Sequence, residues 1–166
     1  ISVLVVKYTL AREVASHAVD LVAKKLERRD AKCQTDRHAI PGGDMPAVDA
    51  YARQEIAKRP WGLAEATVRH LIDNYGTRYA AILQHLSENE NWRQRISSRE
   101  DVIAAEVVHG VRHEMARTLE DVVRRRTELG SAICPDDASL RKCADLLAKE
   151  LGWDTQKIDQ EIAATK

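Results

Sequence analysis

The chain has 166 residues, of which 44% are hydrophobic and 31% charged, and its 26 basic residues balance 26 acidic ones. This length supports a domain with a buried core, and the zero net charge removes the bulk attraction to nucleic acid or anionic membranes. No apolar run approaches the roughly 18 residues that a membrane-spanning helix needs. The three cysteines form no CxxC pair, which favours a reducing cytosol over a disulfide framework.

The first six residues, ISVLVV, form a continuously apolar and largely β-branched run. This pattern predicts a short strand that is buried on both faces. The rest of the sequence offers no obvious partner strand, and the chain begins at Ile1 rather than at a methionine. We therefore expect a fragment whose sheet lies in a preceding domain. The alternative is a strand that pairs with a partner molecule or packs on the helices.

Residues 10–29 carry apolar side chains at a helical period, which predicts an amphipathic helix. The polar stretch that follows contains Pro41-Gly42-Gly43, a loop signal. Pro46 can open the next helix, because proline at the first helical position needs no N–H partner. We expect that helix to end at Pro60-Trp61-Gly62.

Glycine and hydroxyl residues mark the predicted helix ends in the middle of the chain. Gly76 is expected to close a helix that includes residues 68–75, and Thr77 to cap the next one. Ser98 followed by Asp101 resembles a capping box that would open a helix running to residue 115.

The last three helices have clear start and stop signals. Thr118 is expected to cap a short helix, Asp136 to start a longer one and Asp154 to cap the last, with Gly152 as a stop between them. Together these segments predict an all-α bundle of about seven to eight helices with short connections, preceded by the one short strand.

His109 and His113 are four residues apart on a predicted helix, so their imidazoles would share one face, where they could bind a metal ion. Two ligands do not complete a site, and no third ligand is evident from the sequence. We therefore interpret both as surface histidines and predict no metal site.

The only dense basic group comprises Arg117 and residues 124–126. The acidic residues nearby are Glu114, Glu120, Asp121 and Glu128. We expect an internal network of ion pairs, and Glu120 with Arg124 has the favourable i,i+4 spacing. The alternative is docking onto another domain or onto anionic lipid headgroups. Binding of nucleic acid is not expected, because the charge is balanced and no aromatic residues interleave.

Several motifs together resemble a known enzyme family. Residues 7–12, KYTLAR, resemble the K-x-T-x-x-R segment of FAD-dependent, aerobic-type glycerol-3-phosphate dehydrogenases. Residues 41–43 resemble the loop that leads into the C-terminal domain of that family, and residues 74–78, NYGTR, resemble its YG-[ST]-R turn. Residues 111–127 resemble the segment before its final helices, and residues 147–153 resemble its ending. The order and spacing of these motifs carry the resemblance over nearly the whole chain.

The resemblance implies the C-terminal part of a flavoprotein that oxidises sn-glycerol 3-phosphate to dihydroxyacetone phosphate and passes the electrons to quinone. FAD would belong to the parent protein and not to this fragment, which we expect to be inactive alone. Lys7 would be a catalytic and cofactor-binding cation, Thr9 would bind the flavin, and Arg12 would bind the substrate. Without the resemblance, these residues read as a solvated lysine, a capping threonine and a surface arginine.

Two features depart from the family pattern. Val5-Val6 stand where the family has glycine before the lysine, a position at which the backbone approaches the flavin closely. The chain also contains no G-x-G-x-x-G dinucleotide fingerprint. The nucleotide-binding domain is therefore expected upstream.

The resemblance divides the chain into residues 1–29 as the end of the FAD-binding domain, 30–45 as a linker and 46–166 as the C-terminal helical cap domain. The implied partner is the FAD-binding domain of the same protein, in the cytoplasm; peripheral contact with the inner face of the cell membrane and a homodimer stay open. The competing hypothesis is a non-catalytic helical protein-interaction module. That module explains the bundle but not KYTLAR directly after an apolar strand.

Overall fold

A computed structural model describes residues 3–4, 7–28, 33–45 and 47–166. The chain divides into two compact units, Ile1–Ile40 and Pro41–Lys166. The described residues form helices and no strand, apart from one isolated bridge between Arg95 and Ile103. The predicted all-α class is confirmed. Residues 1, 2, 5 and 6 of the predicted strand and the predicted helix start at Pro46 lie outside the described part, so both stay predictions.

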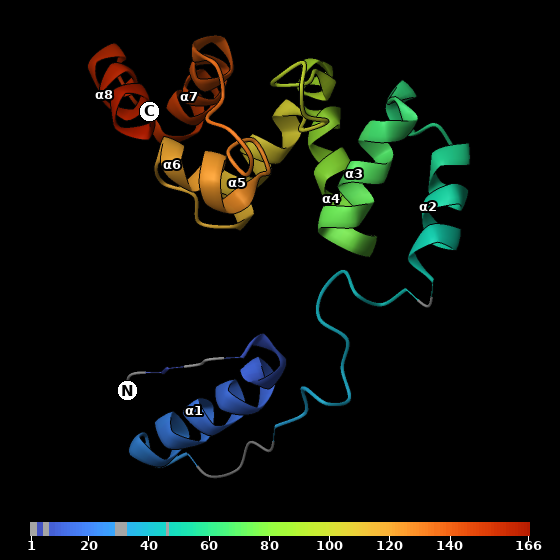
Figure 1. Cartoon of the computed structure of the whole chain (residues 1–166), viewed down its shortest axis with the longest axis vertical. Coiled ribbons are helices and arrows are strands. Elements are labelled where there is room, and N and C mark those ends of the chain that lie inside the picture. Colours follow the sequence, from blue (N-terminus) through green and yellow to red (C-terminus); the bar gives the residue numbers. More distant parts are fainter. Residues whose placement is uncertain (1–2, 5–6, 29–32, 46) are drawn as a thin grey trace. The chain divides into compact units, whose positions relative to one another are not determined.

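The N-terminal unit contains one long helix with a short lead-in turn (Figure 1). The 3-10 turn η1, Tyr8–Leu10, runs directly into α1, Ala11–Lys25. The helix predicted over residues 10–29 is confirmed, but α1 ends earlier, since Glu27 has a positive φ of 55° that interrupts helical geometry. None of the residues of α1 is buried.

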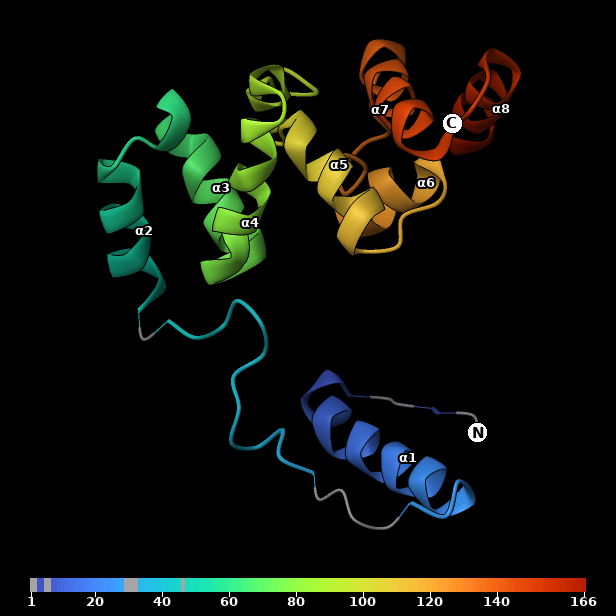
Figure 2. The same ribbon diagram turned by 180° about the vertical axis from the view of Figure 1, so that it is seen from behind.

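The C-terminal unit contains seven α-helices in its described residues, which follow one another from α2 at one end to α8 at the other (Figures 1 and 2). They are α2 (Val48–Ala57), α3 (Glu65–Tyr75), α4 (Tyr79–Gln84), α5 (Ala104–His113), α6 (Leu119–Asp121), α7 (Asp137–Leu151) and α8 (Thr155–Thr165). The 3-10 turns are η2 (Pro60–Gly62), η3 (Gly76–Arg78), η4 (His85–Ser87) and η5 (Glu90–Arg93), and a π-helical turn, η6 (Val122–Arg126), continues α6. No helix in the described residues is both long and apolar enough to cross a membrane.

Helix α5 is the centre of the C-terminal unit because it contributes to both of its hydrophobic clusters. Val107 of α5 belongs to a cluster with residues of α6, α7 and α8, such as Leu147. Ala105 of α5 belongs to a second cluster with residues of α2, α3 and α4, such as Leu71 and Ile82. Burial of these apolar side chains is the main term that stabilises the bundle.

Most of the predicted helix ends are confirmed. Thr118, Asp136 and Asp154 cap α6, α7 and α8, and each side chain accepts a hydrogen bond from the backbone N–H three residues later, at 3.1, 2.8 and 2.8 Å. Gly76 follows α3, and Gly152 ends α7 in the left-handed conformation. Both partners of each capping interaction lie within a few residues of one another, so the caps can be predicted from the local sequence.

The predicted capping box at Ser98 and Asp101 is wrong. Helix α5 begins after Ile103, and the backbone N–H of Ile103 donates to Oε1 of Glu106 at 2.8 Å. The carbonyl of Ser98 instead accepts a hydrogen bond from Arg95 at 2.9 Å. The buried carboxylate of Glu106 therefore replaces the predicted cap.

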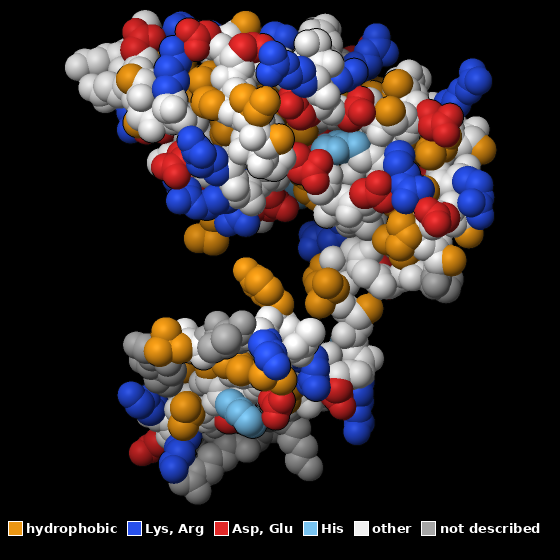
Figure 3. Space-filling model, viewed as in Figure 1, with side chains coloured by type: hydrophobic (Ala, Val, Ile, Leu, Met, Phe, Trp, Pro, Cys, Tyr) orange, Lys and Arg blue, Asp and Glu red, His pale blue; other side chains and the backbone are white. Residues whose placement is uncertain are grey.

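The basic group lies around the π-helical turn η6, which the sequence did not predict. In such a turn the backbone hydrogen bonds reach five residues back instead of four. This register places Arg125 against the acidic residues, 2.8 Å from Asp121 and 3.5 Å from Glu120. The predicted pairing of Glu120 with Arg124 is wrong: Arg124 instead donates to the carbonyl of Thr165 at 3.1 Å, and Arg125 is the arginine near Glu120. Basic and acidic side chains interleave over the visible face of this unit, as an internal ion-pair network requires (Figure 3).

Candidate functional site

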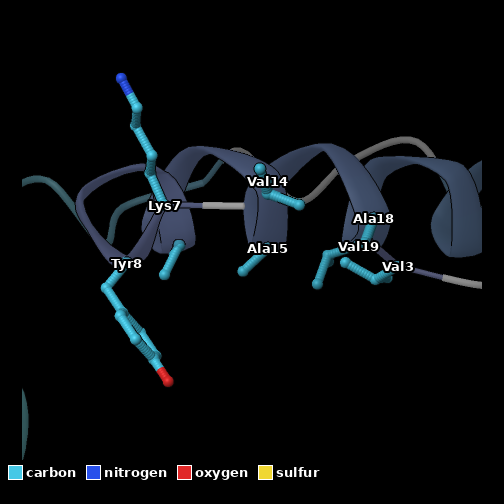
Figure 4. Close-up of a pocket in the computed structure, with 8 residues that line it drawn as sticks. Val3, Lys7, Tyr8, Val14, Ala15, Ala18 and Val19 are labelled. Atoms are coloured by element: carbon cyan, nitrogen blue, oxygen red, sulfur yellow. The ribbon is translucent and has the colours of Figure 1, made fainter. Parts of the chain in front are cut away.

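The three residues for which the resemblance implies a flavin or substrate role lie on the N-terminal unit. Lys7 precedes η1 with an extended backbone, Thr9 lies in η1, and Arg12 lies in the first turn of α1. All three are exposed. No hydrogen bond or ion pair among the described residues joins them to one another. The Lys7 side chain points away from the side on which Tyr8 and Ala15 lie (Figure 4).

An apolar surface of the same unit accompanies these residues. A hollow of about 660 Å³ is lined by Tyr8 and by small and β-branched side chains, and Lys7 is the one charged residue of its described lining (Figure 4). Further along, Val19 and Leu21 of α1 and Leu26 directly after it are 64%, 54% and 66% exposed. An apolar surface of this kind typically contacts another protein or domain.

Two of the motifs that carry the family resemblance contact each other in the C-terminal unit. Gly42 and Gly76 both have a positive φ, of 93° and 58°, which disfavours residues with a side chain. The carbonyl of Gly42 accepts a hydrogen bond from the backbone N–H of Thr77 at 3.0 Å. A Cβ on Gly76 would overlap the carbonyl oxygen of Gly42, and a Cβ on Gly42 would overlap that of Tyr75. We call this contact the glycine junction.

The predicted cap at Thr77 is wrong because of this junction. The Thr77 hydroxyl donates to Asp44, and this hydrogen bond lowers the pKa of the Asp44 carboxyl group. Helix α4 begins at Tyr79 without a side-chain cap. Thr77 therefore fastens the segment after Gly42 to the turn between α3 and α4.

A buried ion pair lies beside a polar hollow of about 280 Å³ that is lined by residues of α3, α5 and η6. His70 Nε2 is 3.1 Å from Oε2 of Glu106, a residue that is only 1% exposed, and His70 Nδ1 is 3.6 Å from Glu128. Burial opposes the charged imidazole, but the hydrogen bond to Glu106 and the charges of Glu106 and Glu128 outweigh it and raise the pKa of His70. This pair is not apparent from the sequence, because no motif or period relates α3 to α5.

Three histidines gather where α5 ends. His109 and His113 lie on one face of α5, as predicted, with ring centroids 4.7 Å apart. Nε2 of His85, from η4, is 3.1 Å from Nδ1 of His109. His85 and His109 are each 6% exposed, so the interpretation of His109 as a surface histidine is wrong, while His113 is exposed. Burial and the neighbouring His113 and His85 lower the pKa of His109 to about 4. His85 was missed because only the tertiary fold brings it to α5.

Comparison with known proteins connects this fold to a family. A family model described as the C-terminal domain of alpha-glycerophosphate oxidase matches residues 33–158. The chain belongs to this family. The match includes the glycine junction and the three histidines, and it begins after Lys7, Thr9 and Arg12. The resemblance drawn from the motifs is thereby confirmed.

Curated relatives are similar over nearly the whole chain. A glycerol-3-phosphate dehydrogenase of Synechocystis sp. is 30% identical over 165 residues, which cover 94% of this chain and 28% of that protein. One of Mycobacterium leprae is 30% identical over 159 residues, with coverages of 95% and 27%. A probable mitochondrial glycerol-3-phosphate dehydrogenase of Dictyostelium discoideum is also 30% identical, with coverages of 94% and 24%. The chain therefore spans about a quarter of the length of these relatives.

Proposed function

We propose that this chain is the C-terminal helical domain of an FAD-dependent dehydrogenase that oxidises sn-glycerol 3-phosphate to dihydroxyacetone phosphate and passes the electrons to a quinone. The proposal rests on the family match over residues 33–158 and on relatives named glycerol-3-phosphate dehydrogenase that match 94–95% of the chain. Since the chain spans about a quarter of these relatives, we assign the nucleotide-binding part to the segment upstream. The isolated chain is then catalytically silent.

In this proposal the N-terminal unit approaches the cofactor and the substrate. FAD, when bound to the parent protein, supplies the acceptor for the hydride that leaves C2 of the substrate. Lys7 holds a positive charge beside the flavin or the substrate phosphate, and Thr9 donates its hydroxyl hydrogen to the flavin. Arg12 offers a planar pair of donors to the phosphate. The exposure of all three supports these roles, as does the lack of a carboxylate partner for Lys7 among the described residues.

The apolar surface of α1 supports docking of this unit against the upstream domain. Full burial of an exposed side chain of this size contributes about 1.5–3 kcal/mol, and Val19, Leu21 and Leu26, which are already partly buried, would each contribute a part of that value on docking. We place the parent protein in the cytoplasm with peripheral contact to the inner face of the membrane, because its quinone acceptor resides in the bilayer. A homodimer is compatible with this arrangement and is not required by it.

The deciding experiment uses the parent protein, extended upstream of Ile1. Its visible spectrum is recorded anaerobically before and after addition of glycerol 3-phosphate. We expect a bound flavin whose absorbance bleaches with substrate. A flavin that does not respond would exclude this substrate, and a parent without flavin would favour the protein-interaction module.

The role of Lys7 is tested by Lys7→Ala in the parent protein, with Lys25→Ala at the other end of α1 as the matched control. We expect Lys7→Ala to slow flavin reduction by about 100-fold, because a fixed charge beside the reacting groups is lost. The control should reduce at the wild-type rate, as measured by stopped-flow absorbance. Equal rates for the two variants would show that Lys7 is only a surface lysine.

The isolated chain provides a complementary test. We expect the 166-residue polypeptide to be purified without FAD, because it contains no dinucleotide fingerprint. Its absorbance spectrum from protein expressed with excess riboflavin measures this directly. A stoichiometric flavin band would contradict the assignment of the cofactor to the upstream domain.

A further inference from the structure

We propose that His85, His109 and His113 form a binding site for a divalent transition-metal ion of the Zn²⁺ type, which fastens η4 to helix α5. This three-histidine site lies in the C-terminal unit and is independent of the flavin chemistry proposed above.

The three rings converge from two elements. Their centroids are 4.7 Å apart for His109 and His113, 5.4 Å for His85 and His109, and 5.5 Å for His85 and His113. One ring nitrogen of each residue lies within 4.8 Å of the other two. Nε2 of His85 and Nδ1 of His109 are 3.1 Å apart, whereas two nitrogens bound to a tetrahedral Zn²⁺ are separated by roughly 3.3 Å. The nitrogens of His85 and His109 therefore already have nearly the separation that two ligands of one ion require.

His113 completes the set with a small movement of its own ring. Its side chain is exposed, and no hydrogen bond among the described residues holds it. A change of side-chain torsion can thus bring its nitrogen to the ion without disturbing the core. Three protein ligands leave a fourth coordination position for water, which the exposure of His113 opens to solvent.

The surroundings of His85 and His109 suit ligation. Nε2 of His85 and Nδ1 of His109 share one proton in their hydrogen bond. When the ring that donates this proton carries it on its other nitrogen instead, both facing nitrogens are free to bind a metal ion. For His85 that other nitrogen, Nδ1, lies 3.9 Å from Oε1 of Glu88. This distance is longer than a hydrogen bond, so Glu88 contributes a nearby negative charge that favours a bound cation rather than a fixed hydrogen bond to the ring.

The charges near the cluster permit a cation. Arg112 is paired with Glu88 and with Glu150, at 2.8 Å in each case. Arg78 is a further cation that acts on His109, so two carboxylates offset two guanidinium groups. Because the surrounding charges nearly cancel, the type of metal ion that binds is decided by the imidazole nitrogens. Nitrogen ligands suit Zn²⁺, Cu²⁺ or Ni²⁺, whereas Mg²⁺ and Ca²⁺ require oxygen ligands.

The test is a calorimetric titration of Zn²⁺ into the full chain, freed of metal with a chelator. The exposed Cys33 and Cys134 are alkylated beforehand, because thiolates also bind zinc. We expect one ion per chain with micromolar or tighter affinity. His113→Ala should weaken binding at least about tenfold. Because His113 is exposed, this variant should retain the wild-type circular dichroism spectrum.

Matched controls are His17→Ala and His38→Ala, which remove histidines outside the cluster and should leave the affinity unchanged. Zinc should also raise the thermal unfolding midpoint of the wild type and of both controls, but not that of His113→Ala. His85→Gln tests whether η4 contributes a ligand. If His85→Gln fails to fold, His113→Ala still decides whether the metal site exists. The absence of binding at micromolar zinc, or equal binding by wild type and His113→Ala, would overturn the proposal.

Discussion

His70 and His109 lie on α3 and α5 of the same unit, yet their pKa values are shifted in opposite directions. Burial disfavours the charged form of both imidazoles. For His109, burial and the neighbouring histidines act together, and the pKa falls to about 4. For His70, the buried carboxylate of Glu106 and the charge of Glu128 outweigh burial, and the pKa rises. The partner that each ring meets therefore decides its charge.

The His70–Glu106 pair should make stability depend on pH. Because the pKa of His70 is higher in the folded than in the unfolded chain, its stabilisation is complete below about pH 6.5 and is lost as the pH rises through the folded pKa. We expect His70→Gln to lower the free energy of unfolding most at about pH 5.5 and progressively less toward about pH 9. Urea denaturation of both proteins measures this difference. The charges of Asp101 and Glu128 also favour the protonated form of His70. A difference in the free energy of unfolding that does not change with pH would contradict the charged pair.

At the scale of the element, the sequence predicts what is decided within a few residues. Thr118 and Asp154 each accept a hydrogen bond from a backbone N–H three residues away, so their roles are visible in the sequence. Thr77 and Ser98 also have hydroxyl side chains but do not cap a helix. The Thr77 hydroxyl instead donates a hydrogen bond to Asp44. Its partner lies in a distant segment, and no local pattern records it.

The same distinction explains how much of the candidate sites was predictable. The i,i+4 spacing placed His109 and His113 on one face, but His85 joins them only through the packing of η4 on α5. The π-helical turn at residues 122–126 was likewise not predicted, and Arg125 rather than Arg124 lies near Glu120. The roles of Lys7, Thr9 and Arg12 stay predictions, because they depend on a domain outside this chain.

The glycine junction gives a prediction at the same scale. Gly76→Ala places a Cβ against the carbonyl of Gly42 and strains a backbone with φ of 58°. We expect a loss of about 2–3 kcal/mol in the free energy of unfolding, since strain and a displaced hydrogen bond add together. Gly152→Ala is the matched control, because it also has a positive φ but a Cβ there meets no other atom within 4 Å. Urea denaturation that gave equal losses for the two variants would exclude the close contact as the cause.

At the scale of the whole molecule, the members of both hydrophobic clusters lie, among the residues that the structure describes, in the C-terminal unit. All their members lie between Tyr51 and Ile162, and α5 contributes to both clusters. The described residues of α1 include no buried side chain. The described part of the N-terminal unit therefore contributes no residue to either cluster.

A shortened chain comprising residues 41–166 should accordingly fold on its own. We expect its free energy of unfolding to stay within about 0.5 kcal/mol of that of the full chain, because no core residue is removed. Urea denaturation followed by circular dichroism compares the two proteins. A shortened chain with little helix or no cooperative transition would show that residues 1–40 contribute to the core.

The glycine junction also bears on how this sequence can diverge. A side chain at Gly42 or at Gly76 meets backbone atoms of the opposite segment, so the two positions are constrained by the same close approach of two turns. Replacing either glycine therefore requires the backbone of the opposite segment to move. The two glycines should thus be inherited together, whereas Gly62, where a Cβ meets no other atom within 4 Å, escapes this joint constraint.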